Sequence, residues 1–356
     1  MRRNTTKNKK NSLLSEISSQ ALVGRGGASF PLALKIEAII DSMKKEKEVY
    51  IVINAAEGEP GVKKDGYILN KHAEDFMLGV NEVYKIIGKE FVKGVYLYIN
   101  KEYYKSYKKN VDKALEKRSF SGLKKVFKYF IKPIDSGYIG GEETAILNII
   151  EGKKNEARFR PPYPTIKGLF SKPTLINNVE TFYDVALLSR GDYRNERFYT
   201  ISGAVKKPGV YRFSSDTPIE TVLKKTGNYP NCNFFVQVGG NASGDILNTD
   251  QLIVTAGSAA SIMVYDMKRT DEKKLINYWL KFYYQNSCGQ CVTCREGTYR
   301  LYEMYQAGNY DEDIFWDIVL ALDDSSFCAL GSSLPVPLLS YYRNIKKVKI
   351  SNKFIN

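Results

Sequence analysis

The first half of the chain alternates short apolar runs with longer segments in which apolar residues recur at helical spacing. Val49 to Ile53, Val95 to Ile99 and Val126 to Ile131 have the length and composition of strands. Helices are predicted at Pro31 to Met43, His72 to Ile87, Glu102 to Leu115, Glu142 to about Gly152, and Asn177 to Leu188. This alternation is typical of an α/β domain with a largely parallel sheet.

The pattern changes near Arg197, which predicts a domain boundary. Phe198 to Gly203 and Gly209 to Phe213 have the form of a hairpin, followed by a short helix from Pro218 and a strand from Phe234. From about Asp271 the pattern is helical. We therefore expect a basic tail at residues 1–20, an α/β domain at 21–192, a small α+β domain at 193–270 and a helical domain at 271–356, since 356 residues exceed one ordinary core.

The charge balance is strongly basic, with 53 Lys and Arg against 39 Asp and Glu and a net charge of +14. We read the basic residues as spread along the chain, with one cluster from Arg2 to Lys10, and this favours compositional drift over a nucleic-acid or anionic-lipid surface. No apolar stretch approaches the roughly 20 residues that span a bilayer. We expect a cytoplasmic protein without a membrane span, either free or peripheral on the cytoplasmic face of a membrane complex.

The single histidine, His72, excludes several mechanisms. A zinc site of the HExxH type needs two histidines, and no G-x-S-x-G segment accompanies His72 to form a serine triad. Because His72 lies at the start of a predicted helix, we expect a capping or surface role.

Four of the five cysteines indicate a metal centre. Cys288, Cys291 and Cys294 lie on one short loop, where Gly289 relieves backbone strain, and Cys328 is a distant fourth thiol. A three-plus-one set of thiolates suits a [4Fe–4S] cluster, whereas zinc usually takes two separated pairs. Arg295 either donates to cluster sulfurs or lies on a helix surface, and Cys232 is expected to be structural.

Three loops carry glycines or carboxylates next to predicted strands and helices. Gly24 to Gly27 precedes a helix and allows close approach of an anion. Asn54 to Gly61 follows a strand directly, and Tyr138 to Glu143 resembles it in composition. In an α/β sheet such loops lie at the carboxyl edge, where ligands bind. The alternative for each loop is an ordinary turn with helix-capping acids.

Taken together, these segments resemble the NADH-binding flavoprotein subunit of respiratory complex I and its relatives in hydrogenases and formate dehydrogenases. The resemblance runs from Gly24 to the C-terminus and has the order of the family. The matching segments are GRGGASFPLALK from Gly24, NAAEGEPG from Asn54, YIGGEETAILNIIEG from Tyr138, RPPYP from Arg160, KPTLINNVET from Lys172, SCGQCVTCREG from Ser287 and FCALG from Phe327.

The resemblance implies a Rossmann-like FMN and NADH domain, a small ubiquitin-like α+β domain and a C-terminal helical bundle that carries the [4Fe–4S] cluster. It places FMN against Gly24, Arg25, Gly27, Lys35, Asn54, Glu57, Tyr138, Gly141, Glu142, Asn177, Asn178 and Thr181. It places NADH against Phe30, Glu59, Glu143, Arg160 and Tyr163, with Glu143 disfavouring the 2′-phosphate of NADPH. The cluster ligands are Cys288, Cys291, Cys294 and Cys328.

The chain departs from the family pattern at four positions. Ala56 stands where the family has Asp in the flavin loop, and Ala38 where it has a second aromatic near the adenine. Gly140 replaces a frequent Cys, and Ser29 replaces a Gly.

The implied reaction passes a hydride from NADH to FMN, then single electrons to the cluster and on to a partner in a quinone-reducing chain. Such chemistry needs no acid or base residue, because the cofactor carries it. Expected partners are iron–sulfur subunits, including a thioredoxin-like ferredoxin. Three alternatives remain: the flavoprotein subunit of an NAD-linked hydrogenase or formate dehydrogenase, an iron–sulfur scaffold that has lost flavin binding, and a zinc-bearing nucleic-acid module.

Overall fold

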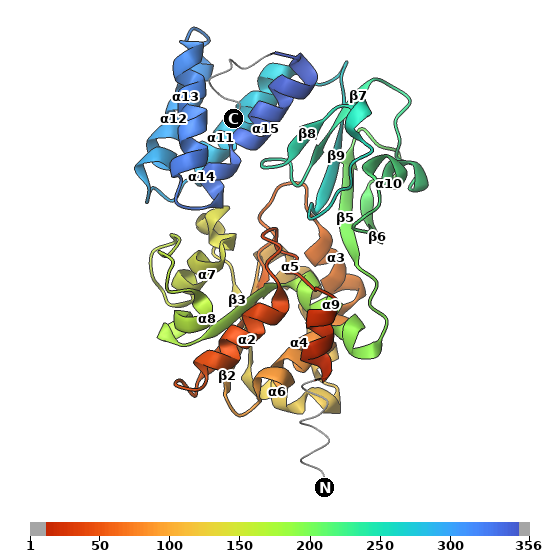
Figure 1. Cartoon of the computed structure of the whole chain (residues 1–356), viewed down its shortest axis with the longest axis vertical. Coiled ribbons are helices and arrows are strands. Elements are labelled where there is room, and N and C mark those ends of the chain that lie inside the picture. The colour runs from red at the N-terminus through yellow and green to blue at the C-terminus, as the bar shows by residue number, and fades with distance from the viewer. Residues whose placement is uncertain (1–11, 349–356) are drawn as a thin grey trace. The chain divides into compact units, whose positions relative to one another are not determined.

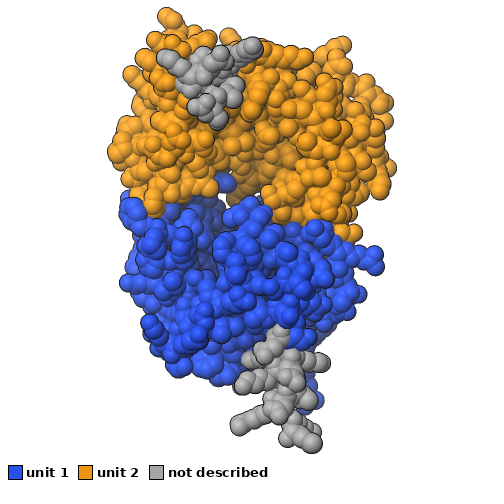
Figure 2. All heavy atoms as spheres, viewed as in Figure 1, with its two compact units in different colours: residues 1–57, 63–195 blue, residues 58–62, 196–356 orange. Residues whose placement is uncertain are grey.

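The computed structural model describes residues 12–348 and separates into two compact units (Figures 1 and 2). Unit 1 comprises residues 1–57 and 63–195, and unit 2 comprises residues 58–62 and 196–356. The predicted basic tail at residues 1–20 is wrong for its described part, because residues 12–19 are helical and Leu13 and Ile17 are buried. Residues 1–11 lie outside the described residues. The division of residues 193–356 into two domains stays a prediction.

Unit 1 is built on a four-stranded sheet in which every neighbouring pair is parallel. The strands are β1 (Val49–Ala55), β2 (Val92–Ile99), β3 (Phe127–Ile131) and β4 (Thr174–Asn178), in the order β3-β2-β1-β4. The chain winds from β1 outward to β3 and then returns to the other side of β1. The direction of winding therefore reverses between β1 and β4, and open α/β sheets bind ligands at such a point. The predicted mixed α/β fold with a parallel sheet is confirmed.

Helices connect these strands (Figure 1). They are α2 (Leu32–Ser42), α3 (Lys64–Lys71), α4 (Ala73–Ile87), α5 (Lys101–Leu115), α6 (Ser121–Val126), α7 (Glu143–Ile150), α8 (Pro164–Lys167) and α9 (Val179–Arg190). Short 3₁₀ turns lie at η1 (Arg118–Phe120), η2 (Ile134–Ser136), η3 (Ile139–Gly141) and η4 (Leu169–Ser171).

Apolar residues cover both faces of the sheet in unit 1. Val52, Tyr98 and Ile176 of three strands form one cluster with Ile146 and Leu147 of α7. Elsewhere in the unit, α4 and α9 pack backbone against backbone. A Cβ atom at Gly79 of α4 would lie 1.6 Å from the carbonyl oxygen of Phe182 in α9, so only glycine permits this contact.

Unit 2 contains a five-stranded sheet in the order β6-β5-β9-β7-β8. The strands are β5 (Glu196–Gly203), β6 (Gly209–Ser214), β7 (Phe234–Val238), β8 (Asp245–Leu247) and β9 (Ser261–Asp266). Only the β5–β9 pair is parallel. Helix α10 (Ile219–Lys225) covers this sheet, burying Ile219, Val222 and Leu223 against Phe234 and Val264.

The rest of unit 2 is helical, as the sequence predicts. The elements are α11 (Glu272–Asn286), α12 (Val292–Ala307), α13 (Glu312–Ser325), α14 (Ala329–Ser333), α15 (Pro335–Tyr341) and the π-helical turn η6 (Tyr342–Lys346). Within residues 12–348, no helix has both the length and the apolar character that a membrane crossing requires.

The sequence prediction misses several elements, of which β4 is the most important for function. We predicted a helix from Asn177, whereas Asn177 and Asn178 close a strand and the helix begins at Val179. Polar side chains at the end of a five-residue strand hide the buried pattern of Thr174 to Ile176. Strand β9 and helix α3 were also not predicted.

Candidate functional site

The carboxyl ends of β1 and β4 bring three of the predicted loops together. Asn54 and Asn178 are register partners, and the Asn178 amide donates to the Asn54 carbonyl oxygen at 3.3 Å. The Asn54 amide in turn donates to the carbonyl oxygen of Gly141 at 2.9 Å. The hydrogen bonds thus tie the ends of both strands to the turn that leads into α7.

The glycine-rich loop lies against the first turn of α9. The Gly24 amide donates to the Phe30 carbonyl oxygen at 2.8 Å and closes the loop. The Arg25 amide donates to the Thr181 hydroxyl at 2.9 Å. Gly27 has φ of 110°, a conformation that favours glycine.

Asn177 presents an unsatisfied hydrogen-bond donor beside this loop. The residue is buried, and among the described residues its Nδ2 has no hydrogen-bond partner. A Cβ atom at Gly24 would lie 3.9 Å from its Oδ1, which places the amide next to the glycines. A buried donor without a partner costs free energy. A bound group with carbonyl or phosphate oxygens would satisfy it, so these residues fit FMN.

The Arg25 side chain does not point to a free anion site. Its guanidinium Nε lies 2.7 Å from Asp184, and NH2 donates to the Tyr193 hydroxyl at 2.9 Å. Both members of the ion pair are almost fully buried. An FMN contact from this guanidinium would require the ion pair to break. In the structure the Arg25 side chain instead tethers the glycine-rich loop to Asp184 and Tyr193.

Glu57 caps the first turn of α3. Its carboxylate accepts from the amides of Asp65 at 2.7 Å and Gly66 at 3.2 Å, and also from the Tyr103 hydroxyl. Burial, and then the charge of Asp65, raise the pKa of Glu57 to about 7. Glu57 also has φ of 38°, in the left-handed region, immediately after β1.

Lys64 forms a buried ionic cluster that the sequence did not reveal. Its ammonium lies 2.8 Å from Asp65 and 3.1 Å from Glu180, and it donates to the Asn178 amide oxygen at 2.6 Å. Burial opposes the charge, but the carboxylates outweigh it and raise the pKa of Lys64 to about 12. This cluster fixes the side chain of Asn178, which also caps α9 by accepting from the Glu180 amide.

Of the predicted NADH residues in unit 1, Glu143 and Arg160 form an ion pair, which the predicted FMN residue Lys35 joins. The Glu143 carboxylate lies 3.0 Å from Lys35 and 3.1 Å from Arg160. Glu142 caps α7 by accepting from the Thr144 and Ala145 amides, the capping role that the sequence left as an alternative. Phe30 and Tyr163 are 49% and 55% exposed, so both rings are available for stacking. Tyr138 precedes η3 and is half-buried.

Glu59 belongs to unit 2. There it accepts hydrogen bonds from the amides of Ala242 at 3.1 Å and Ser243 at 3.2 Å. Its assignment to NADH stays a prediction.

Two departures from the family pattern fit their surroundings. A Cβ at Gly140 would lie 2.5 Å from the Ser136 hydroxyl, so Ser136 occupies the space that a larger residue would need. Ala56 is buried in the cluster beneath α7, where it supplies no polar group.

The cysteines gather at the helix ends of unit 2. Cys291 and Cys328 immediately precede α12 and α14, and Cys294 is buried in the first turn of α12. A Cβ at Gly331 would lie 3.2 Å from the Cβ of Cys294, so α14 and α12 are closely packed there. Burial raises the pKa of the Cys294 thiol to about 12, and the charges of Cys291, Cys328 and Cys288 add to this effect.

This arrangement fits an iron–sulfur cluster better than a single ion. All four cysteines interact electrostatically, yet in the described part of the chain no three His, Cys, Asp or Glu residues are placed to hold one metal ion. In a [4Fe–4S] cluster each thiolate binds a different iron, so the sulfurs need not converge on one point. Iron binding would also deprotonate the Cys294 thiol, which burial keeps neutral.

The structure also places Arg295 and Cys232, the two residues considered together with the cluster cysteines. Arg295 donates to the carbonyl oxygen of Gly289 at 2.9 Å and lies near Glu296, so it braces the cysteine loop from the surface. The expectation that Cys232 is structural is wrong, because this thiol is exposed.

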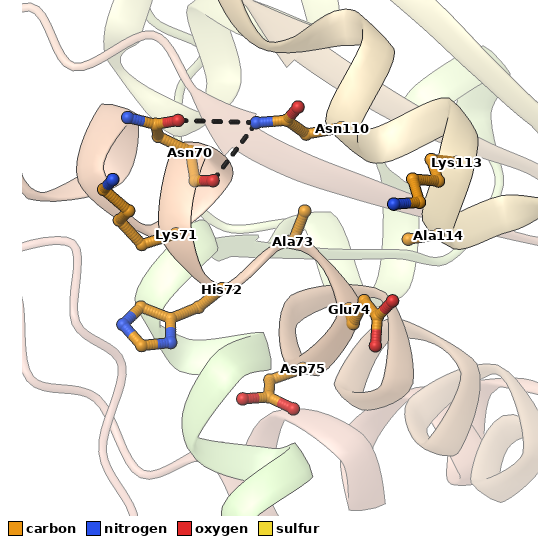
Figure 3. Close-up of a pocket in the computed structure, with 9 residues that line it drawn as sticks. All are labelled: Asn70, Lys71, His72, Ala73, Glu74, Asp75, Asn110, Lys113 and Ala114. Carbon is orange, nitrogen blue, oxygen red and sulfur yellow. Dashed lines mark hydrogen bonds between the residues drawn. The ribbon is translucent and has the colours of Figure 1, made fainter.

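A cavity of about 370 Å³ lies elsewhere in unit 1 (Figure 3). None of the predicted FMN or NADH residues lines it. Its lining comes from the α3–α4 corner and from α5: Asn70, Lys71, His72, Ala73, Glu74, Asp75, Asn110, Lys113 and Ala114. His72 occupies the N-cap position of α4 without a side-chain capping bond, and its ring packs near Tyr67 and Tyr183.

Two family models match the chain. Residues 17–187 match the Nuo51 FMN-binding domain, and residues 274–348 match the NADH-ubiquinone oxidoreductase-F iron-sulfur binding region. The first contains the glycine loop and the ends of β1 and β4, and the second contains all four clustered cysteines.

Individual relatives agree with these matches. The chain is 28% identical to the F subunit of the NADH-quinone oxidoreductase of Aquifex aeolicus, over 89% of this chain and 80% of that protein. It is 29% identical to the protein of that name from Mycobacterium bovis, over 94% and 83%. It also resembles the structure of an NAD⁺-reducing [NiFe]-hydrogenase in the H₂-reduced state, with a TM-score of 0.84 and 26% identity, over 96% of this chain and 63% of that one.

Proposed function

Because two regions of the chain match the Nuo51 FMN-binding domain and the NADH-ubiquinone oxidoreductase-F iron-sulfur binding region, we propose that it oxidises NADH with FMN and passes the electrons through a [4Fe–4S] cluster to a partner. The observation that carries this proposal is the unsatisfied Asn177 amide beside the glycine loop, within the matched FMN-binding region. FMN, when bound, supplies the conversion between the two-electron chemistry of NADH and the one-electron chemistry of the cluster.

The residues of unit 1 would hold and orient FMN at the carboxyl edge of β1 and β4. The backbone of Gly24 to Gly27 allows close approach of a phosphate, and Lys35 supplies a positive charge nearby. Asn177 would donate to a flavin or phosphate oxygen. Asn54, Glu57, Tyr138, Gly141, Glu142, Asn178 and Thr181 complete the proposed set; of these, Asn54, Glu57, Glu142 and Asn178 also hold loops and helix ends in place.

NADH would lie across the exposed rings of Phe30 and Tyr163, with Glu143 and Arg160 beside its ribose and phosphates. Glu143 is paired with both Lys35 and Arg160, which fixes its carboxylate. A carboxylate held in this way accepts from the ribose 2′-hydroxyl of NADH, and the 2′-phosphate of NADPH cannot supply that donor. Glu59 is the remaining proposed NADH contact.

Cys288, Cys291, Cys294 and Cys328 would ligate the cluster, which serves as the exit for single electrons. We propose that unit 2 consists of a ubiquitin-like domain and a helical bundle that carries this cluster. The proposed partners are iron–sulfur subunits, including a thioredoxin-like ferredoxin. The proposed location is the cytoplasm, or the cytoplasmic face of a membrane complex.

A second candidate is the flavoprotein subunit of an NAD-linked hydrogenase. The likeness to the NAD⁺-reducing [NiFe]-hydrogenase favours it, although this chain spans only 63% of that chain. A third candidate is a scaffold that has lost flavin binding, which Ala56 in the flavin loop would favour. Flavin content of the purified protein separates this scaffold from the two enzymes.

An anaerobic visible spectrum of the purified protein, before and after NADH, tests the proposal. Flavin peaks above a broad iron–sulfur absorption, bleached by NADH but hardly by NADPH, are expected. A broad absorption without flavin, even after added FMN, would leave the scaffold. A colourless protein that retains zinc would refute both the enzyme and the iron–sulfur scaffold.

A further inference from the structure

The basic charge of the chain is concentrated, contrary to the even spread that we read from the sequence. Residues 101–132 contain eleven Lys or Arg and three Asp or Glu, a net charge of +8. All other residues between 12 and 348 contain 35 basic and 36 acidic side chains. Compositional drift would enrich every segment and does not explain one charged segment in an otherwise neutral body.

This segment forms α5, η1, α6 and the edge strand β3 of unit 1. Its exposed cations that make no ion pair with any described residue are Lys101, Lys105, Lys109, Lys113, Arg118, Lys125 and Lys128. The first four recur at four-residue intervals along α5, so each is about 6 Å further along the helix axis. We call these four residues the lysine stripe.

The lysine stripe ends at the cavity of Figure 3. Lys113 lines that cavity together with Asn110 of the same helix and with Lys71. Glu74 and Asp75 also line it, but they are neutralised by Lys117 at 2.6 Å and Arg190 at 2.9 Å. The cavity therefore adds a recess, lined by Lys113 and Lys71, to the end of an extended cationic helix; neither lysine makes an ion pair with a described residue.

One feature favours a protein over a membrane or a nucleic acid. The rings of Tyr104 and Tyr107 lie half-buried between the lysines, and tyrosine is enriched in protein interfaces. Complementary charge would guide the approach and orientation of an acidic partner.

We propose that the lysine stripe and the adjoining cavity dock an acidic segment of another protein, with one of its carboxylate side chains inserted beside Lys113. This contact goes beyond electron transfer, since it involves none of the proposed FMN, NADH or cluster residues.

A charge reversal in the full-length chain tests the proposal. The variant carries Lys101→Glu, Lys105→Glu, Lys109→Glu and Lys113→Glu. The matched control carries Lys45→Glu, Lys89→Glu, Lys206→Glu and Lys273→Glu, which are also exposed and make no ion pair with a described residue. The unchanged chain and both variants are purified at low salt, each from the cells that produce it, together with the proteins bound to it. A carbodiimide then joins contacting lysines and carboxylates, and mass spectrometry locates the cross-links.

The expected result is cross-links from the lysine stripe to Asp or Glu residues of one co-purified protein. Recovery of that protein should fall about tenfold in the stripe variant, but not in the control, and also in the unchanged chain above about 0.3 M salt. Equal recovery with both variants would overturn the proposal. So would loss of binding only to phosphatidylglycerol vesicles or to single-stranded DNA, which would identify a phosphate-binding surface. NADH oxidation with ferricyanide should persist in both variants, so failure here is distinguishable from failure of the proposed enzyme activity.

Discussion

At the scale of single residues, Asn177 and Asn178 are neighbours with opposite roles. Asn178 is satisfied by Lys64, Asp65 and the first turn of α9, whereas the Nδ2 of Asn177 has no partner among the described residues. One asparagine thus maintains the structure, and the other is free to bind a ligand.

Replacing Asn177 by leucine should weaken FMN binding about fivefold, because one buried hydrogen bond contributes about 1 kcal/mol. The melting temperature of the flavin-free protein should change little, since no contact to Nδ2 is lost. Titration of FMN fluorescence gives the affinity. In the matched variant Asn178→Leu, the buried Lys64 loses an acceptor, so the flavin-free protein itself should melt earlier. Unchanged FMN affinity in Asn177→Leu would remove Asn177 from the site.

Glu57 should make stability depend on pH. Its pKa in the folded chain, about 7, is above its ordinary value of 4.5, so the folded state holds a proton that the unfolded state releases. The contribution of Glu57 to stability is therefore greatest below pH 4.5 and is lost as the pH rises through 7.

The wild type should lose about 2 kcal/mol relative to Glu57→Gln across this pH range, somewhat less than the full shift implies because the residue is partly exposed. Thermal unfolding of both proteins at several pH values measures the difference. Parallel stability curves would show that Glu57 stays ionised in the folded chain.

At the scale of residues, the sequence indicated which residue types the site contains, but it did not predict which side chains contact one another. The pattern placed Arg25 in an anion-binding loop, but its guanidinium pairs with Asp184, 159 positions away. Lys64 was not predicted to be part of a site, because adjacent Lys and Asp residues are common on protein surfaces. Only the fold buries them together with Glu180.

At the scale of elements, the contact between α4 and α9 depends on Gly79. Gly79→Ala should destabilise the chain by about 3 kcal/mol, because the added methyl group overlaps the Phe182 carbonyl. Gly122→Ala in α6 is the control, since its Cβ would meet only Tyr84 at 3.8 Å. That change should be neutral or stabilise by about 0.5–1 kcal/mol through helix propensity. Thermal unfolding compares them, and equal effects would contradict the close packing.

Strands β1, β2 and β3 were predictable because each is a short apolar run bounded by a helix pattern. Strand β4 was not, because its last two residues are the asparagines that its position at the sheet edge requires. The two asparagines suit a ligand site but are not typical strand residues, so they mask the strand in the sequence pattern.

At the scale of the whole molecule, the proposed redox groups belong to different units. Cys328→Ser should abolish the electron paramagnetic resonance signal of the reduced cluster and lower the iron content. Bleaching of the flavin by NADH should persist, because the FMN residues lie in unit 1. Cys232→Ser, at an exposed thiol, should change neither. Loss of FMN together with the cluster would show that the units do not bind their cofactors independently.

The ordered motifs predicted an FMN-binding region and an iron–sulfur region, and the two matched regions confirm both. The distribution of charge was missed, although the sequence alone contains it. Averaged over the whole chain, the excess of basic residues resembles compositional drift. Its concentration is recognised only when the helices, the turn and the edge strand of residues 101–132 are considered as one surface.

The short segment at residues 58–62 has a consequence for how the protein is made. It interrupts unit 1 but belongs to unit 2, where Glu59 bonds to an amide 183 residues later. At ribosomal rates of about 5–20 residues per second, its partner emerges roughly 10 to 40 seconds afterwards. Residues of unit 1 can therefore fold while this loop still lacks its partners. The loop engages residues that are synthesised long after it.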